Sequence, residues 1–266
     1  MRVHFIIHES FEAPGAYLAW AALRGHEVSI TKVYQFEGLP ESVGDFDMLI
    51  VMGGPQSPSS TQEEFPHFNA GAEIALIKKA IQADKYIIGV CLGAQLLGQA
   101  YGGTCIASPE REIGNFPIEL TQAGQADSRL SHIPQGLVVG HWHGDMPGLV
   151  ERAQILATSQ GCPRQIIAYS QKHFGFQAHL ELTKDLVRQL LAQEKDIEGD
   201  SQKYTYVQDA QTILNYDYDQ MNQALYGFLD KLIVNENQKM PRQGTAGTTR
   251  VEQSELTTES FDFRRV

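Results

Sequence analysis

The stretch at residues 86–101, YIIGVCLGAQLLGQAY, indicates the fold class of this chain. It begins with an apolar run of strand length, and from Ala94 onward it has the small and apolar residues of a helix. Gly89, Cys91 and Gly93 form the turn between the two, and the glycines leave room for a sharp bend around the cysteine. A strand that passes through such a turn into a helix is typical of α/β proteins.

The segments before this stretch repeat the alternation of strands and helices. Compact apolar runs predict strands at residues 3–7, 28–33 and 48–52, and helical periodicity predicts helices at residues 14–25 and 72–83. Because continuous apolar strands are buried on both faces, these elements predict a mostly parallel sheet with helices on both faces.

The pattern changes after Gly103, where Gly, Pro and polar turns separate short apolar segments. We expect further strands there, of mixed direction. They are placed at residues 116–120, 137–142, 155–158, 165–169 and 174–178. A helical region follows, with helices expected at residues 182–193, 204–214 and 218–233.

The composition is that of an ordinary globular protein. Of the 266 residues, 42% are hydrophobic, which is enough to form a core without disulfides or metal ions. The chain has 32 acidic and 21 basic residues, and the resulting net charge of −11 opposes binding to nucleic acid or to anionic lipid. The longest weakly polar run, at residues 87–98, is shorter than the roughly 20 residues that cross a bilayer. Neither nucleic acid nor a membrane is therefore expected as a partner.

Cysteine usage indicates a reducing compartment. Cys91, Cys105 and Cys162 include no close pair, so neither a disulfide framework nor a zinc knuckle is predicted. The apolar run at residues 3–7 is too short for a signal peptide and is followed by acidic residues. A cytoplasmic location is therefore expected.

Residues 1–234 are expected to form one domain. In residues 235–266, Gly, Thr, Gln, Glu and Arg dominate and the apolar residues are too scattered for a core, so a polar, disordered tail is predicted. The chain contains no glycine-rich signature for binding a dinucleotide or a triphosphate. No cofactor is predicted.

Cys91 is the first candidate catalytic residue. At a helix N-terminus the free backbone amides favour the thiolate, which is the reactive form. The same position also suits a buried small hydrophobic residue, and the local spacing alone favours neither interpretation. Farther along the chain, His179 and Glu181 are two residues apart, a spacing that on a strand directs both side chains to one face. Because a cysteine nucleophile needs a base and the base needs an orienting group, we predict a triad of Cys91, His179 and Glu181.

A glycine pair, Gly53-Gly54, follows the predicted strand at residues 48–52, which in a parallel sheet ends beside the cysteine turn. We predict that the backbone amides of Gly54 and Leu92 stabilise a tetrahedral oxyanion. Gly53 and Gln95, which lies one helical turn beyond the cysteine, are expected to contact an amide-bearing substrate. The alternatives without a catalytic role are a simple turn at the end of the strand for the glycine pair and a solvated side chain for Gln95.

The segment from His141 through His143 to Asp145 alternates His and Asp, a pattern also found in metal sites. Gly144 and the Pro147-Gly148 pair predict a turn here, and no cysteine or further carboxylate completes a ligand set in the sequence. No metal is therefore predicted. We expect His143 and Asp145 to meet the ammonium and carboxylate groups of a substrate.

Together these motifs resemble the class I (triad) glutamine amidotransferases, in the free-standing group similar to the amidotransferase domain of GMP synthase. The resemblance covers residues 1–234. It rests on Gly53-Gly54-Pro55, on the cysteine turn with Gln95 four residues after Cys91, on Glu112-Ile113-Gly114, on His143-Gly144-Asp145 and on Gln177-x-His179-x-Glu181.

The resemblance implies a flavodoxin-like α/β sheet with a small antiparallel excursion. It also implies that Cys91 attacks the carboxamide of glutamine to give a glutamyl thioester and ammonia, and that water then releases glutamate. In this reaction His179 acts as base and acid, and Glu181 holds its tautomer.

Two features depart from the family pattern. Leu180 stands where many members have proline, and residues 235–266 are too short and polar to be a synthetase domain. Ammonia therefore goes to a separate synthase as partner, or the thioester is simply hydrolysed. The second option resembles the γ-glutamyl peptide hydrolases of the same fold. A regulatory or binding subunit that is active only with a partner synthase is a further alternative, suggested by the aromatic residues of the helical region.

Overall fold

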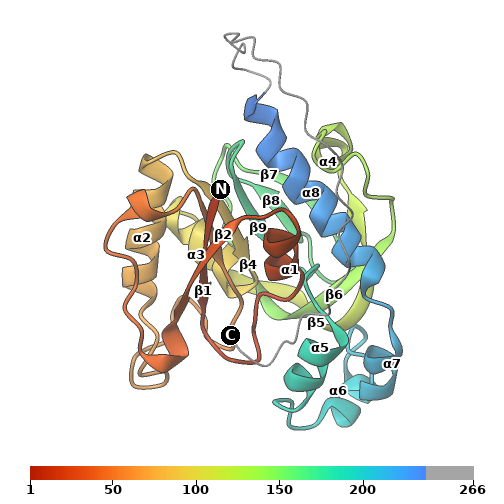
Figure 1. The fold of residues 1–266 in the computed structure, drawn as a ribbon. Coiled ribbons are helices and arrows are strands. Elements are labelled where there is room, and N and C mark those ends of the chain that lie inside the picture. The colour runs from red at the N-terminus through yellow and green to blue at the C-terminus, as the bar shows by residue number, and fades with distance from the viewer. Residues whose placement is uncertain (238–266) are drawn as a thin grey trace, which may run out of the picture.

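The first half of the chain alternates strands and helices, as predicted (Figure 1). The computed structural model describes residues 1–237. In this half the elements are β1 (Arg2–Ile7), α1 (Ala16–Leu23), β2 (Glu27–Lys32), β3 (Met48–Val51), α2 (Ala70–Gln82), β4 (Tyr86–Val90) and α3 (Leu92–Ala100). Two short 3-10 helices, Val33–Gln35 and Val43–Asp45, lie between β2 and β3.

The second half contains the remaining strands and a helical region. The strands are β5 (Ile106–Leu120), β6 (Leu137–Met146), β7 (Gln154–Thr158), β8 (Ile166–Ala168) and β9 (His173–Phe176). The helices are α4 (Gln122–Ala126), α5 (Lys184–Leu191), α6 (Ile197–Lys203), α7 (Ala210–Asn215) and α8 (Asp219–Asn237). The sequence did not predict α4, α6 or the full length of β5.

The described strands form one nine-stranded sheet in the order β2-β1-β3-β4-β9-β8-β7-β5-β6. The pairs from β2 across to β9 are parallel, and the pairs from β9 to β6 are antiparallel, so four of the eight neighbouring pairs are of each kind. The predicted α/β class and the mixed direction of the later strands are confirmed.

The sheet separates two hydrophobic cores, because successive residues of a strand point to opposite faces. One core lies under α1 and α8, and it takes Phe5, Ile50 and Ile88 from the central strands. The other lies under α2 and α3, and it takes Ile6, Leu49 and Ile87. Figure 1 shows α2 on one side of the sheet and α1 with α8 on the other. The apolar strands are thus buried on both faces, as their sequences predict.

The helix predicted at residues 204–214 is wrong for residues 204–209, and only its last part is helical, as α7. Residues 205–206 form a turn and Val207 makes an isolated bridge with β5, where the N–H of Ile113 donates to the carbonyl oxygen of Tyr206 at 2.8 Å. The N–H of Gln208 in turn donates to the carbonyl oxygen of Ile113 at 2.9 Å. α7 begins only after Asp209, whose carboxylate caps the helix. Bonds to a strand far away in the sequence replace the helical bonds that local periodicity favours.

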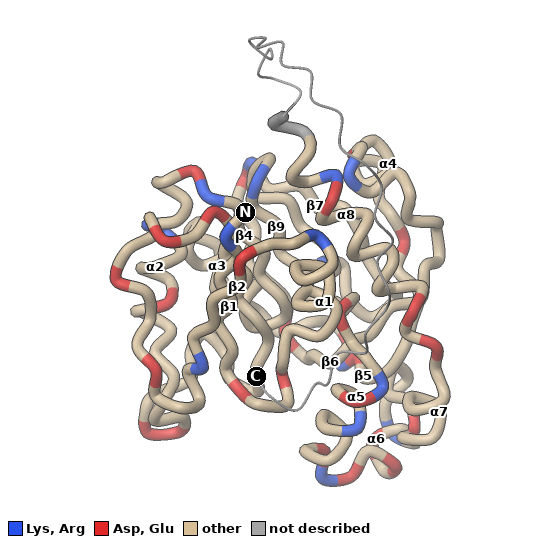
Figure 2. Tube along the Cα trace, in the orientation of Figure 1, with Lys and Arg blue, Asp and Glu red and all other residues tan. Residues whose placement is uncertain are grey.

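The last helix, α8, continues three residues beyond the predicted domain boundary at residue 234. The predicted polar tail falls almost entirely in residues 238–266, which lie outside the described residues. Within residues 1–237, no helix is both long enough and apolar enough to cross a membrane. Figure 2 shows Lys and Arg scattered among more numerous Asp and Glu along the described chain.

Candidate active site

Cys91 lies in the turn between β4 and α3. Its backbone has φ +50° and ψ −108°, a conformation that few non-glycine residues adopt. A Cβ on Gly89 would lie 2.3 Å from the carbonyl oxygen of Gly93, and a Cβ on Gly93 would lie 2.0 Å from that of Val51. The thiol Sγ is 3.8 Å from the carbonyl oxygen of Trp142. The sharp turn that the sequence predicts is therefore present, and it depends on both glycines.

The register of the sheet brings His179 toward Cys91. β9 is the parallel neighbour of β4, with Phe176 opposite Val90. The N–H of Cys91 extends this pairing by donating to the carbonyl oxygen of Phe176 at 2.7 Å. His179 follows three residues later, and its backbone exchanges two hydrogen bonds with Gly140 on β6. The histidine is thus held between the parallel and the antiparallel parts of the sheet.

The imidazole of His179 is paired with Glu181. Nδ1 and the carboxylate Oε1 are 2.7 Å apart, and both side chains are buried. Nε2 has no hydrogen-bond partner within the described residues. Burial opposes the charged imidazole, but the charge of Glu181 and contacts with Cys91 and Glu181 outweigh it and raise the pKa of His179 well above its ordinary value. Such a histidine can stabilise a neighbouring thiolate as an ion pair.

The other two cysteines are in surroundings that oppose ionisation. Burial, together with the charges of Asp145 and Cys91, raises the pKa of Cys105 to about 12. Burial also raises the pKa of Cys162, against the effect of a hydrogen bond with Ser108. Neither residue begins a helix, whereas Cys91 is the N-cap of α3. Of the three thiols, Cys91 alone lies at a helix N-terminus, and its role as the nucleophile stays a prediction.

The glycine pair lies beside the cysteine turn, because β3 and β4 are parallel neighbours that end at the same edge. A Cβ on Gly53 would be 3.4 Å from the Cβ of Cys91. A Cβ on Gly54 would be 3.1 Å from Cδ2 of Leu92. The structure therefore brings Gly54 and Leu92, the two residues predicted to supply oxyanion amides, together next to the thiol. Their role as donors stays a prediction.

Gln95 is buried on α3 and is not solvated. Its side-chain amide donates to Oε1 of Gln177 at 3.2 Å, so it contacts the segment that carries His179. Within the described residues, Oε1 of Gln95 and Nε2 of Gln177 have no partner. One acceptor and one donor are thus left over, and the contact of Gln95 with a substrate stays a prediction.

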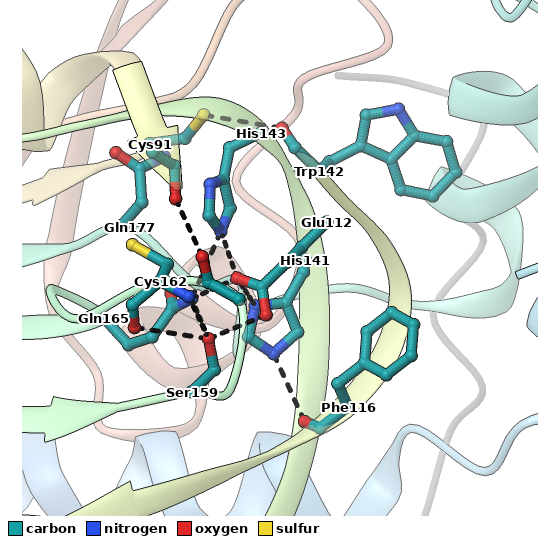
Figure 3. A network of polar contacts seen from close by, with 12 residues as sticks. Cys91, Glu112, Phe116, His141, Trp142, His143, Ser159, Cys162, Gln165 and Gln177 are labelled. Atoms are coloured by element: carbon teal, nitrogen blue, oxygen red, sulfur yellow. Dashed lines mark hydrogen bonds and ion pairs between the residues drawn. The ribbon is translucent and has the colours of Figure 1, made fainter. Parts of the chain in front are cut away.

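The segment around His141 and His143 forms a strand, and the predicted turn is wrong. β6 runs through both residues to Met146, because antiparallel pairing with β5 satisfies its backbone. Figure 3 shows the two imidazoles on the same side of β6, directed at Glu112 of β5. Oε2 of Glu112 is 3.2 Å from Nε2 of His143 and 3.6 Å from Nδ1 of His141. Trp142, between them, turns its carbonyl toward the thiol instead.

Glu112, His141 and His143 place three potential metal-ligand atoms within 4.8 Å of one another. Glu112 is therefore the carboxylate that the sequence pattern lacked. Hydrogen bonds nevertheless occupy this carboxylate, since Ser159 donates to Oε1 at 2.7 Å and Gln165 donates to Oε2 at 2.6 Å. Burial lowers the pKa of His141 to about 4, so this imidazole is neutral near pH 7. Within the described residues, Nδ1 of His141, Nδ1 of His143 and Oε1 of Gln165 have no hydrogen-bond partner, so this polar network is only partly satisfied. The absence of a metal stays a prediction.

The two residues predicted to meet substrate charges are placed differently. His143 is buried, and its Nε2 is engaged by Glu112 and Gln165. Asp145 is half-buried farther along β6, opposite Ala107. Of these two residues, Asp145 alone makes no contact with the polar network around Glu112. A contact with the substrate remains a prediction for both residues.

Sequence reasoning missed Glu12, which lies between β1 and α1. Its Oε2 is 2.6 Å from the position that a Cβ on Gly53 would take, and the same position is 3.4 Å from the Cβ of Cys91. Burial, only partly offset by the charge of His179, raises the pKa of Glu12 to about 7. The one sequence signal is a carboxylate shortly after the first strand, which is also common in solvated loops.

Comparisons with known proteins show which family this chain resembles. The family model "Glutamine amidotransferase class-I" matches residues 19–195. The glutamine amidotransferase-like protein YfeJ of Salmonella typhimurium is 47% identical over 239 residues, which are 90% of this chain and 100% of YfeJ.

Two solved structures extend the likeness. The crystal structure of SMU.1228c is 62% identical, with a TM-score of 0.87 over 88% of this chain and 100% of that one. A glutamine amido transferase from Methylobacillus Flagellatus is 25% identical, with a TM-score of 0.77 over 94% and 99%. The predicted fold is confirmed, and the amidotransferase family model covers more than half of the residues. The chain therefore belongs to the class I glutamine amidotransferases.

Proposed function

We propose that this protein hydrolyses the γ-carboxamide of glutamine to glutamate and ammonia through a thioester on Cys91. The observation that carries the proposal is the buried His179–Glu181 pair beside a cysteine that caps a helix in a sharp turn. Family membership supports the same reaction class. The three groups supply a nucleophile, a base and an orienting carboxylate.

In the first step, the Cys91 thiolate attacks the carboxamide carbon and a C–S bond forms. The amides of Gly54 and Leu92 donate to the resulting oxyanion. His179 gives the proton on Nε2 to the nitrogen, the C–N bond breaks and ammonia leaves. The glutamyl group remains on Sγ as a thioester.

In the second step, water attacks the thioester and His179 takes a proton from it. The C–S bond breaks, so glutamate leaves and the thiolate is regenerated. Glu181 keeps Nδ1 protonated and stabilises the positive charge that the imidazole carries before the first step and again after it takes the proton from water. The hydrogen bond of 2.7 Å between these side chains supports this role.

Glu12 is the group that we assign to the α-ammonium of the substrate. Its carboxylate is half-buried beside Gly53, which adjoins Cys91, and accepts no hydrogen bond within the described residues. An ammonium would supply the missing positive charge, and burial would strengthen the pairing. Asp145 is then left for a contact farther from the thiol.

The proposal is tested by glutamate and ammonia release from purified protein and by labelling with an acivicin-type isoxazoline. Peptide mapping is expected to find the adduct on Cys91, and Cys91→Ala is expected to lose both turnover and labelling. Cys105→Ser is the matched control, and it should keep both. An adduct on Cys105 or Cys162 with Cys91 unmodified would contradict the assignment.

The same assay with γ-glutamyl dipeptides separates the two hydrolase alternatives. Hydrolysis of the dipeptides without turnover of glutamine would replace the glutaminase proposal by γ-glutamyl peptide hydrolysis. Turnover of glutamine only after addition of a cell extract would indicate a subunit that needs a partner synthase.

A further inference from the structure

A buried histidine–carboxylate pair lies behind the glycine pair. His8 directly follows β1, and its Nδ1 is 2.9 Å from the carbonyl oxygen of Gly53. Its Nε2 is 2.8 Å from Oε2 of Glu73, on α2. The side chain of His8 is fully buried and that of Glu73 is 1% exposed. None of the motifs at the cysteine turn includes either residue.

The chemistry of the two contacts defines the charge of this imidazole. A carbonyl oxygen can only accept a hydrogen bond, and an ionised carboxylate can only accept one. With Glu73 as a carboxylate, both ring nitrogens of His8 carry protons, and the ring is an imidazolium paired with Glu73. Burial opposes this charge, but Glu73 and the bond to Gly53 outweigh it and raise the pKa of His8 above its ordinary value.

The contact with Gly53 fixes the direction of the next amide. In a trans peptide the C=O and the following N–H point in opposite directions, and no peptide bond of residues 1–237 is cis. Because the carbonyl of Gly53 is directed at His8, the N–H of Gly54 is directed away from it. The Gly53–Gly54 peptide lies between the side chains of Cys91 and His8. A Cβ built on Gly53 would be 3.4 Å from the Cβ of Cys91, and a Cβ built on Gly54 would be 3.0 Å from the Cβ of His8.

We propose that the His8–Glu73 pair is a positioning device for the oxyanion site, which holds the Gly53–Gly54 peptide in one orientation and polarises it. A positive donor on the carbonyl oxygen withdraws charge from the amide, and this makes the N–H of Gly54 a stronger donor. The inference rests on the proposed function, since it assumes that Gly54 serves the oxyanion.

A stronger donor acts mainly in the transition state, where the charge on oxygen develops. Its loss therefore lowers kcat and leaves KM nearly unchanged. Removal of a whole oxyanion donor typically costs about 10²- to 10³-fold in kcat. Loss of the charge behind the donor is expected to cost about 10-fold, because the N–H itself remains.

Glu73→Gln separates charge from orientation. The Gln amide can donate to Nε2, which leaves a neutral ring with Nδ1–H still directed at Gly53. Glu73→Asp keeps the carboxylate and is expected to retain more of kcat than Glu73→Gln. His4→Gln is the matched control, because His4 is also a buried histidine, lies within β1 and bonds to Ser29 and Thr31, away from the glycine pair.

The experiment combines steady-state kinetics with NMR of the free protein. Glu73→Gln should lower kcat about 10-fold at constant KM and move the Gly54 amide proton upfield, whereas His4→Gln should do neither. In the parent protein, the ¹⁵N shifts of His8 should show both nitrogens protonated at pH 7.5. A neutral ring, or a Glu73→Gln variant with unmoved Gly54 and the kcat of the control, would overturn the inference.

The NMR readouts keep this inference distinct from the proposed function. A protein with the predicted Gly54 shift but no turnover of glutamine would refute the glutaminase proposal and retain the coupling of Glu73 to Gly54. Measurement of the parent protein also decides the charge of His8 if Glu73→Gln does not fold.

Discussion

The N–H of Cys91 donates to the carbonyl oxygen of Phe176 at 2.7 Å, three residues before His179. This bond continues the β4–β9 ladder one residue into the cysteine turn, although Cys91 is already bent out of strand geometry with φ +50°. The position of the histidine relative to the thiol is therefore set by backbone pairing and not by side-chain packing alone.

The three triad residues should differ in importance. Cys91→Ala is expected to abolish thioester formation and His179→Ala nearly to abolish it, whereas Glu181→Gln should retain measurable turnover. The loss for Glu181→Gln should be about two orders of magnitude smaller than for Cys91→Ala, because the carboxylate orients the base without taking part in bond changes. Initial rates of glutamate release check this ranking. Unchanged turnover in Glu181→Gln would mean that another carboxylate orients His179.

Gly93→Ala should destabilise the protein by about 3 kcal/mol, because overpacking against backbone is costly. The added Cβ would meet the carbonyl oxygen of Val51 at 2.0 Å, and neither strand nor helix can move away without breaking the turn. The helix propensity gained from alanine, at most about 1 kcal/mol, is smaller than this clash. Urea unfolding measures the difference. Gly38→Ala, where no atom lies within 4 Å, is the control and should unfold like the parent.

Glu12→Gln should stabilise the protein at alkaline pH. The pKa of Glu12 is raised from 4.5 to about 7 in the fold, chiefly by burial. The folded state therefore keeps a proton that the unfolded chain loses above about pH 4.5, and stability falls as the pH rises toward about 7. Removal of the carboxyl should raise the thermal midpoint more at pH 8 than at pH 5. An equal effect at both values would contradict the raised pKa.

The same substitution should weaken substrate binding if Glu12 holds the α-ammonium. The KM for glutamine is expected to rise about 10-fold, which corresponds to one charge-assisted hydrogen bond, with a smaller change in kcat. In the parent, KM should fall as the pH rises through about 7, because Glu12 then becomes ionised. Glu41→Gln, at an exposed position, is the control. A parent-like KM in Glu12→Gln would exclude this role.

Truncation after Asn237 should leave activity and the thermal midpoint unchanged. All residues assigned to the site precede this point, as does the whole of the described core. The notional boundary at residue 234 would instead cut into α8. A lower midpoint or a changed KM in the truncated protein would show that residues 238–266 contribute to the enzyme.

Local sequence patterns were enough for the elements that carry the chemistry. The apolar runs of β3 and β4, the glycines around Cys91 and the two-residue spacing of His179 and Glu181 are all properties of short segments. Strand burial and a sharp turn impose steric requirements on consecutive residues, so they leave a readable pattern.

Long-range pairing decided the rest. Glu112 meets His141 and His143 across the β5–β6 ladder, and Ile113 pairs with a segment for which local periodicity predicts a helix. His8, which follows β1, contacts both the carbonyl of Gly53 and the carboxylate of Glu73 on α2, 65 residues away. A buried polar group needs a partner but places no constraint on where in the chain that partner lies, because the sheet order brings distant segments together. The buried charged groups around the thiol therefore could not be predicted from local sequence and were identified only in the tertiary structure.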